Sequence, residues 1–144
     1  MPSIKLTSVE MHFITLFESL TGATTRDCIV DERWNRLIFI VKPGDMGLAI
    51  GKGGINVKRL KRMLGKNIEV VEFSEIPEEF IKHSLSPARV RSVKITNAPD
   101  GRRIAYVTIE PNDKGIAIGR EGKNIARARL IAKRYFDIDH VVVV

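Results

Sequence analysis

The chain has 144 residues, 44% of them hydrophobic, which suits one ordinary globular domain or two small ones and excludes a disordered polypeptide. Its 24 lysines and arginines exceed its 17 aspartates and glutamates, and the net charge of +7 favours a polyanionic partner. A single cysteine, Cys28, excludes an intrachain disulfide and a cysteine-based zinc site. The sequence contains neither a run of 18 apolar residues nor a signal-peptide pattern near its start, so we expect a cytoplasmic protein without a membrane partner.

The first half of the chain alternates helical and extended patterns. Apolar residues spaced along one helix face predict a helix over residues 7–20, with Thr7 or Ser8 as its N-cap and Gly22 just past its end. After this helix we predict, in chain order, strands over residues 26–31 and 36–42, a short helix capped by Asp45, a glycine turn at residues 51–54, a helix that Gly54 opens and Gly65 stops, and a strand over residues 67–73.

The second half of the chain shows the same order of patterns. We predict, in chain order, a helix over residues 77–85, strands over residues 89–97 and 103–110, a short helix capped by Asp113, a glycine turn at residues 119–122, a helix over residues 122–135 and a strand over residues 139–144. Both halves therefore mix helices with strands in the way of an α+β fold.

The two halves also share a motif. The stretch "PGDMGLAIGKGGIN", residues 43–56, aligns with "PNDKGIAIGREGKN", residues 111–124, and 8 of the 14 positions are identical. Repetition at this spacing indicates two copies of one structural unit. We place the boundary near "SEIPEEF" and predict domains over residues 1–74 and 75–144.

Positive charge gathers at both glycine turns. Residues 52–66 contain six bases and no acid, and residues 114–134 contain seven bases and one acid. A helix that begins at a turn directs its unpaired N–H groups and the positive end of its dipole toward that turn. Glycines at both ends of the turn would let a sugar-phosphate chain approach the backbone, and Lys52 or Arg120 would supply charge. Asn56 or Asn124, in the first turn of the helix, would cap the helix or donate to a ligand.

Other phosphate-binding motifs do not fit the spacing. The sequence lacks the G-x-x-x-x-G-K-[ST] of a P-loop, because three residues separate Gly47 from Gly51 and Gly53 follows Lys52. Asn56 occupies the third glycine position of a dinucleotide fingerprint. A turn between two helices with no ligand is the remaining structural alternative, and the duplication makes it the weaker one.

The motifs "AIGKGGINV" and "AIGREGKNI" resemble the I-G-x-x-G-x-x-[IV] core of KH domains, and the order of elements is similar to the type II form. The resemblance implies two tandem KH domains, each a three-stranded mixed sheet packed on three helices. It also implies that each GXXG loop clamps about four nucleotides of single-stranded RNA beside an aliphatic groove. Ile50 and Ile118 would line the floor of that groove or the core, with the core favoured, and Val57 and Ile125 would lie in the core.

A tandem of type II KH domains over residues 4–143 resembles the archaeal form of the NusA family of transcription factors. The resemblance implies a factor that binds nascent single-stranded RNA and modulates elongation, termination or antitermination by RNA polymerase. The residues that we expect to bind RNA are Ile50, Gly51, Lys52, Gly53, Gly54, Asn56, Lys58, Arg59, Ile118, Gly119, Arg120, Glu121, Gly122, Lys123, Asn124 and Arg127.

Glu121 distinguishes the second turn from the first. A carboxylate 4 Å from a phosphate is repelled by about 1 kcal/mol in a water-like dielectric, unless Arg120, Lys123 or Lys114 neutralises it. We therefore expect that the first turn is the stronger phosphate clamp, or that the second reads the strand mainly through its groove.

We expect no enzymatic activity, metal, cofactor or small-molecule substrate. The three histidines are scattered along the chain without HxxxH or HExxH spacing, and Glu78 and Glu79 fit the start of a helix better than an acid–base pair. Two other functions remain open at this point. A ribosomal or ribosome-assembly protein would clamp folded rRNA with the same units, and a DNA-binding regulator would prefer duplex DNA.

Overall fold

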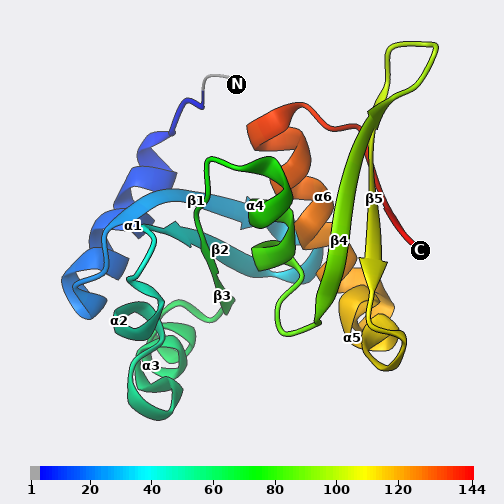
Figure 1. The fold of residues 1–144 in the computed structure, drawn as a ribbon. Coiled ribbons are helices and arrows are strands. Elements are labelled where there is room, and N and C mark those ends of the chain that lie inside the picture. The colour runs from blue at the N-terminus through cyan, green and yellow to red at the C-terminus, as the bar shows by residue number, and fades with distance from the viewer. Residues whose placement is uncertain (1–3) are drawn as a thin grey trace. The chain divides into compact units, whose positions relative to one another are not determined.

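The computed structural model describes residues 4–144 and divides the chain into two compact units (Figure 1). The first unit spans Lys5–Phe73 and the second contains Ser74–Val144, so the predicted boundary lies one residue further along the chain. Residues 1–3 of the predicted first domain lie outside the described residues.

The first unit follows the predicted order of elements. They are α1 (Ser8–Thr21), β1 (Thr25–Asp31), β2 (Arg36–Val41), α2 (Met46–Ile50), α3 (Ile55–Leu64) and β3 (Asn67–Glu72), with 3-10 turns at Glu32–Trp34 and Lys52–Gly54. Thr7 is the N-cap of α1, and Gly22 ends it in a left-handed conformation.

The second unit repeats that order. Its elements are α4 (Pro77–Ser84), β4 (Val90–Asn97), β5 (Arg103–Ile109), α5 (Lys114–Ile118), α6 (Lys123–Phe136) and β6 (His140–Val143), with 3-10 turns at Pro111–Asp113 and Arg120–Gly122. In each unit the first two strands pair antiparallel and the last two pair parallel, which confirms the predicted α+β fold with a three-stranded mixed sheet.

Aromatic contacts organise the core of each unit. In the first unit, Phe17 of α1 stacks on Phe39 of β2 with ring centroids 4.1 Å apart, and both side chains are fully buried. In the second unit, Phe80 of α4 meets Tyr135 of α6 edge-to-face at 4.8 Å. These contacts fix a helix against the sheet in the first unit and a helix pair in the second. Among residues 4–144, no helix combines the length and apolarity that crossing a membrane requires.

Asp45 and Asp113 occupy the predicted N-cap positions of the short helices α2 and α5, but their side chains form no capping hydrogen bond. Both residues have ψ near 0° (4° and 0°), whereas a capping residue is normally extended, and neither side chain bonds the helix. Instead, Asp45 accepts from the backbone N–H of Thr24 at 2.8 Å, and Asp113 accepts from that of Arg89 at 2.8 Å. Each aspartate therefore ties the short helix to the segment that leads into the first strand of its unit.

Candidate nucleic-acid interface

The two glycine loops, Gly51–Gly54 (the first loop) and Gly119–Gly122 (the second loop), have the same backbone path. Gly51 has φ 76° and ψ 167°, and Gly119 has φ 78° and ψ 173°, a conformation that is nearly exclusive to glycine. Gly54 and Gly122, with φ 76° and 81°, precede the long helices α3 and α6. Each loop thus joins a short helix to a long one through a single 3-10 turn.

An asparagine fixes each loop from within. Asn56 Nδ2 donates to the carbonyl of Leu48 at 2.9 Å, and Asn124 Nδ2 donates to that of Ile116 at 2.8 Å. A Cβ on Gly51 would lie 2.8 Å from Asn56 Nδ2, so the asparagine occupies the space that a side chain there would need. The same holds for Gly119 and Asn124, at 2.8 Å. The loop itself therefore requires glycine at Gly51 and Gly119, and the expected approach of a sugar-phosphate chain to them stays a prediction.

The open part of the first loop is Gly53–Gly54. A Cβ on Gly53 would meet nothing within 4 Å, and one on Gly54 would only reach Lys58 Cε at 4.0 Å. The Gly54 amide donates to Gly51 O at 3.0 Å and the Ile55 amide donates to Lys52 O, so the first amide of α3 is not the free donor that we expected. Because nothing fills the space over Gly53 and Gly54, this bend presents bare backbone at the surface.

Glu121 takes the place of Gly53 in the second loop. It has φ 57°, a left-handed conformation that costs a non-glycine residue about 1 kcal/mol. Among the residues that the structure describes, no lysine or arginine forms an ion pair with Glu121, so the neutralisation by Arg120, Lys123 or Lys114 that we considered is absent. The second loop thus carries an exposed, unpaired carboxylate where the first has none.

The bases around the first loop face solvent. Lys52, Lys58 and Arg59 are exposed, and so are Lys61 and Arg62 further along α3. Within residues 4–144 none of these five forms an ion pair. Their charges are therefore available to an anion that lies along the loop and helix.

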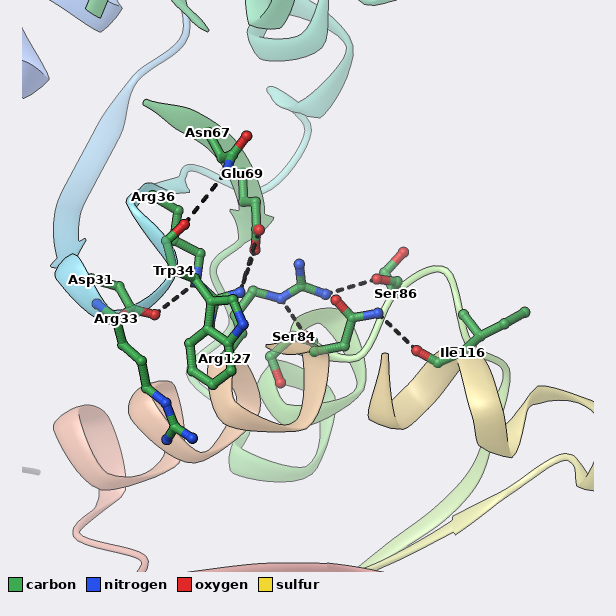
Figure 2. A network of polar contacts seen from close by, with 11 residues as sticks. Asp31, Arg33, Trp34, Arg36, Asn67, Glu69, Ser84, Ser86, Ile116 and Arg127 are labelled. Atoms are coloured by element: carbon green, nitrogen blue, oxygen red, sulfur yellow. Dashed lines mark hydrogen bonds and ion pairs between the residues drawn. The ribbon is translucent and has the colours of Figure 1, made fainter. Parts of the chain in front are cut away.

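The bases of the second unit are largely committed to the fold. Arg127, predicted to bind RNA, is only 8% exposed and donates to the carbonyls of Ser84 at 2.8 Å and Ser86 at 2.9 Å (Figure 2). That prediction is corrected, because Arg127 holds the segment after α4 against α6. Lys133 pairs with Asp137 at 2.7 Å and with Asp139, and these carboxylates raise the pKa of Lys133.

Exposed aliphatic side chains lie beside each loop. Ile50 is 37% and Ile118 is 43% exposed, so the favoured core role of these residues is wrong. The inward positions belong instead to the preceding residues, Ala49 and Ala117, which are fully buried. The core positions predicted for Val57 and Ile125 are confirmed, since the first packs against the core and the second is 5% exposed.

Sequence reasoning missed further exposed residues beside the loops. Leu48 and Ile55 in the first unit are 53% and 48% exposed, and Ile116 in the second is 44% exposed. The helical period around the buried alanines would have found Leu48 and Ile116, because they precede Ala49 and Ala117 and so point away from the core. We call Leu48, Ile50 and Ile55 the first aliphatic strip, and Ile116 and Ile118 the second.

Gly47 and Gly115 are the remaining glycines that the two motifs share. Both lie in short helices without a positive φ, both are exposed, and a Cβ on either would meet nothing within 4 Å. Neither the backbone nor the packing requires glycine there, although glycine in a helix costs about 0.5–1 kcal/mol relative to alanine. Within residues 4–144, no three His, Cys, Asp or Glu side chains are grouped as metal ligands.

The comparison with known proteins agrees with this geometry. The family model described as "KH domain" matches residues 14–77, and that of the "NusA-like second KH domain" matches residues 77–141. The chain is 38% identical over 139 residues to the "Probable transcription termination protein NusA" of Halobacterium salinarum, covering 96% of this chain and 97% of that protein. It is 34% identical to the protein of the same name from Methanocaldococcus jannaschii, covering 100% of this chain and 77% of that protein. The crystal structure of APE1850 superposes with a TM-score of 0.87 at 41% identity, covering 96% of this chain and all of that one.

Proposed function

The chain belongs to the NusA family of proteins with two tandem KH domains, and we propose that it binds nascent single-stranded RNA through both glycine loops to modulate transcription. The proposal includes RNA polymerase as a partner and assigns the chain a binding role without catalysis. It is supported by relatives named probable transcription termination proteins.

One observation carries the proposal: exposed aliphatic side chains and a basic residue lie beside glycine backbone at both loops, although Glu121 covers part of the second. RNA phosphates would lie over Gly53 and Gly54, which expose backbone, with Lys52 at their side. In the second loop Gly122 is the corresponding open glycine, and Arg120 supplies the charge. Phosphate contacts of this kind position a strand without reading its sequence.

The nucleobases would lie on the aliphatic strips. Leu48, Ile50 and Ile55 present apolar surface next to the first loop. Gly47 sits between the start of α2 and this strip, and its missing side chain leaves room for a base or sugar to approach the helix. Such a strip suits unstacked bases, and therefore single strands rather than duplexes.

The remaining predicted contacts surround this site. Lys58, Arg59 and Lys123 would contribute charge near the strand. Asn56 and Asn124 would act by holding the loops, since their amide nitrogens already donate within the protein. Arg127 is left out of the proposed site because it is buried.

The direct test replaces Lys52 and Arg120, together with their neighbours Gly53 and Glu121, by aspartate. We expect Lys52→Asp/Gly53→Asp and Arg120→Asp/Glu121→Asp, combined, to abolish binding of a single-stranded oligoribonucleotide measured by fluorescence anisotropy. Lys5→Asp is the matched control, because it reverses an exposed base outside both loops. Retained backbone NMR spectra would show that the fold is intact.

The outcome also separates the other candidate functions. RNA binding that survives in the combined loop variant would contradict the proposal. A strong preference for folded rRNA, with sedimentation alongside ribosomal particles, would favour the ribosomal alternative. A preference for duplex DNA would favour a DNA-binding regulator.

A further inference from the structure

The sheet of the second unit has one face that its helices do not cover. Along the central strand β5, Ala105, Val107 and Ile109 are buried at 1% exposure or less, whereas Tyr106 between them is 38% exposed. Successive side chains of a strand point to opposite faces, so Tyr106 lies on the outer face. The aromatic ring thus stands near the middle of an open sheet.

The register shows what surrounds this tyrosine. Tyr106 pairs with Lys94 on β4 and with Val142 on β6, which places these three side chains in one row across the sheet. Lys94 is exposed and Val142 is 40% exposed. The neighbouring rows hold the outward positions of Thr96, Ile104 and His140 on one side and of Ser92 and Thr108 on the other.

These outward positions include no carboxylate. The acidic side chains next to these strands form ion pairs: Asp100 with Arg102 at 2.7 Å, Glu110 with Arg91 at 2.8 Å and Asp139 with Lys133 at 3.0 Å. Hydrogen bonds to the Arg102 backbone and side chain hold the pKa of Asp100 below its usual value, and the Arg91 guanidinium does the same for Glu110. With Lys94 unpaired within residues 4–144, the face around Tyr106 is positive.

The corresponding face of the first unit differs in its chemistry. Ile38 occupies the place of Tyr106 on the central strand. Its partners across the sheet are Ile29, where Tyr106 has Lys94, and Glu69, where Tyr106 has Val142. The repeat has therefore exchanged two aliphatic side chains for an aromatic ring and an ammonium group. An aliphatic pair suits a dry contact, whereas a ring beside a cation and hydroxyl groups suits a wet, charged ligand.

We propose that Tyr106 is a stacking platform for a nucleobase of single-stranded RNA and that Lys94 contacts an adjacent phosphate. The inference rests on the proposed function, because it assigns a second contact region to the same ligand. Every nucleobase has a face that stacks on an aromatic ring, so this contact tolerates any sequence. A protein partner would need a broader apolar patch, whereas here the aliphatic Val142 and Ile104 lie among threonine, serine, histidine and lysine side chains around a single ring.

The test compares RNAs of two lengths. We expect Tyr106→Ala to weaken binding of an unstructured RNA of about 16 nucleotides by roughly fivefold, since stacking on one ring contributes that much or more. The affinity for an RNA of about 4 nucleotides, the length that one loop clamps, should stay unchanged. Tyr106→Phe should keep the full affinity. Leu130→Ala is the matched control, because Leu130 is also 38% exposed but lies on α6.

Photocrosslinking gives an independent readout. An RNA that carries 4-thiouridine should crosslink to Tyr106 in the wild-type protein, and Lys94→Ala should reduce the yield. If the RNA perturbs the NMR signals of both loops but not those of Tyr106, the inference is wrong and the proposed function stands. If it perturbs neither, the proposed function itself fails. Self-association that Tyr106→Ala abolishes would show that the face binds a second copy of the chain, and would overturn the inference.

Discussion

The first and second loops share a backbone path but differ in their charges. Both use a glycine with φ near 77° and an asparagine that bonds back across the loop, with matching distances of 2.9 Å and 2.8 Å. The first loop is followed by a helix of unpaired bases, whereas the second contains Glu121 and precedes a helix whose Arg127 is buried. Steric demands on the backbone therefore persisted through the duplication, while the electrostatics of the surface diverged.

This difference predicts a division of labour. The first loop, with Lys52, Lys58 and Arg59 free, should supply most of the salt-dependent affinity for RNA. The second should hold the strand more through its aliphatic strip. The following experiments test the similarity and then the difference.

The largest expected effect comes from the glycines that the loops share. Gly51→Ala and Gly119→Ala should each destabilise their own unit by about 3 kcal/mol, because the backbone conformation excludes a side chain and the new Cβ would overlap the asparagine. Urea unfolding followed by NMR signals of each unit measures the effect. Gly53→Ala is the control, since its Cβ would meet open space and only its positive φ costs energy, about 1 kcal/mol. Equal losses at Gly51 and Gly53 would refute the role of the asparagine.

The second-largest effect is expected at Arg127, which the repeat aligns with Arg59. Arg127→Ala should cost the second unit about 2–3 kcal/mol, because the carbonyls of Ser84 and Ser86 lose their donors inside the fold. Arg59→Ala should change stability by less than about 0.5 kcal/mol, as surface substitutions usually do. It should instead lower RNA affinity and reduce the slope of log affinity against log salt by about one.

Arg127→Lys provides the control for charge. A lysine keeps the positive charge but cannot reproduce the planar guanidinium that reaches both carbonyls, so it should recover little of the lost stability. Full recovery by lysine would mean that charge, rather than the two hydrogen bonds, accounts for the arginine.

The same pair of residues shows what the sequence could and could not predict. Periodicity and glycine placement predicted the elements, the duplication and both loops, because these depend on local patterns. The burial of Arg127 was not predictable, because the motif alignment gives it the same surroundings as Arg59. Only the path of the chain after α4, which brings two carbonyls to Arg127, distinguishes them. RNA contact by the other predicted residues stays a prediction.

Asp45 and Ile50 show a second limit of the same kind. Asp45 stands where a capping residue would, but its carboxylate bonds a backbone amide 21 positions earlier in the chain, a contact that local patterns do not encode. Ile50 precedes the glycine turn as a core residue might, yet in this five-residue helix the fully buried position belongs to Ala49.

Gly53 and Glu121 occupy the same position in the two loops, and exchanging them should change the free energy of RNA binding by less than the stability changes described above. Glu121→Gly removes an unpaired carboxylate and relieves a left-handed backbone, and we expect it to tighten RNA binding about fivefold, corresponding to about 1 kcal/mol. The reciprocal Gly53→Glu should weaken binding by a similar factor. Isothermal titration with single-stranded RNA measures both. Unchanged affinity in the two variants would remove the reason for ranking the loops.

Gly47 and Gly115 test whether function alone retains a glycine. Gly47→Ala should raise the stability of the first unit by about 0.5–1 kcal/mol, because alanine favours the helix and its Cβ meets nothing. The same change should weaken RNA binding, since a methyl group would stand where we place the ligand. Gly115→Ala should act likewise in the second unit. If both variants gained stability without losing affinity, these positions would lie outside the site.

The smallest effect concerns the aspartates that tie the short helices to the strands. Asp113 accepts from the Arg89 side chain as well as its amide, and the side-chain hydrogen bond is the largest cause that lowers the pKa of Asp113. A carboxyl whose folded pKa is depressed contributes stability above its unfolded pKa of about 3.9, and this contribution is lost as the pH falls through the folded value. The variant Arg89→Thr removes the guanidinium but keeps the backbone amide, so that Asp113 has a threonine amide as its donor, as Asp45 has in Thr24. In this variant we expect the pKa of Asp113, measured by NMR, to rise toward about 3.9. The variant should be less stable than the wild type at neutral pH, and this difference should vanish in acid. If the difference in stability persisted at a pH where Asp113 is protonated in both the wild type and the variant, Arg89 would act through packing rather than through its charge.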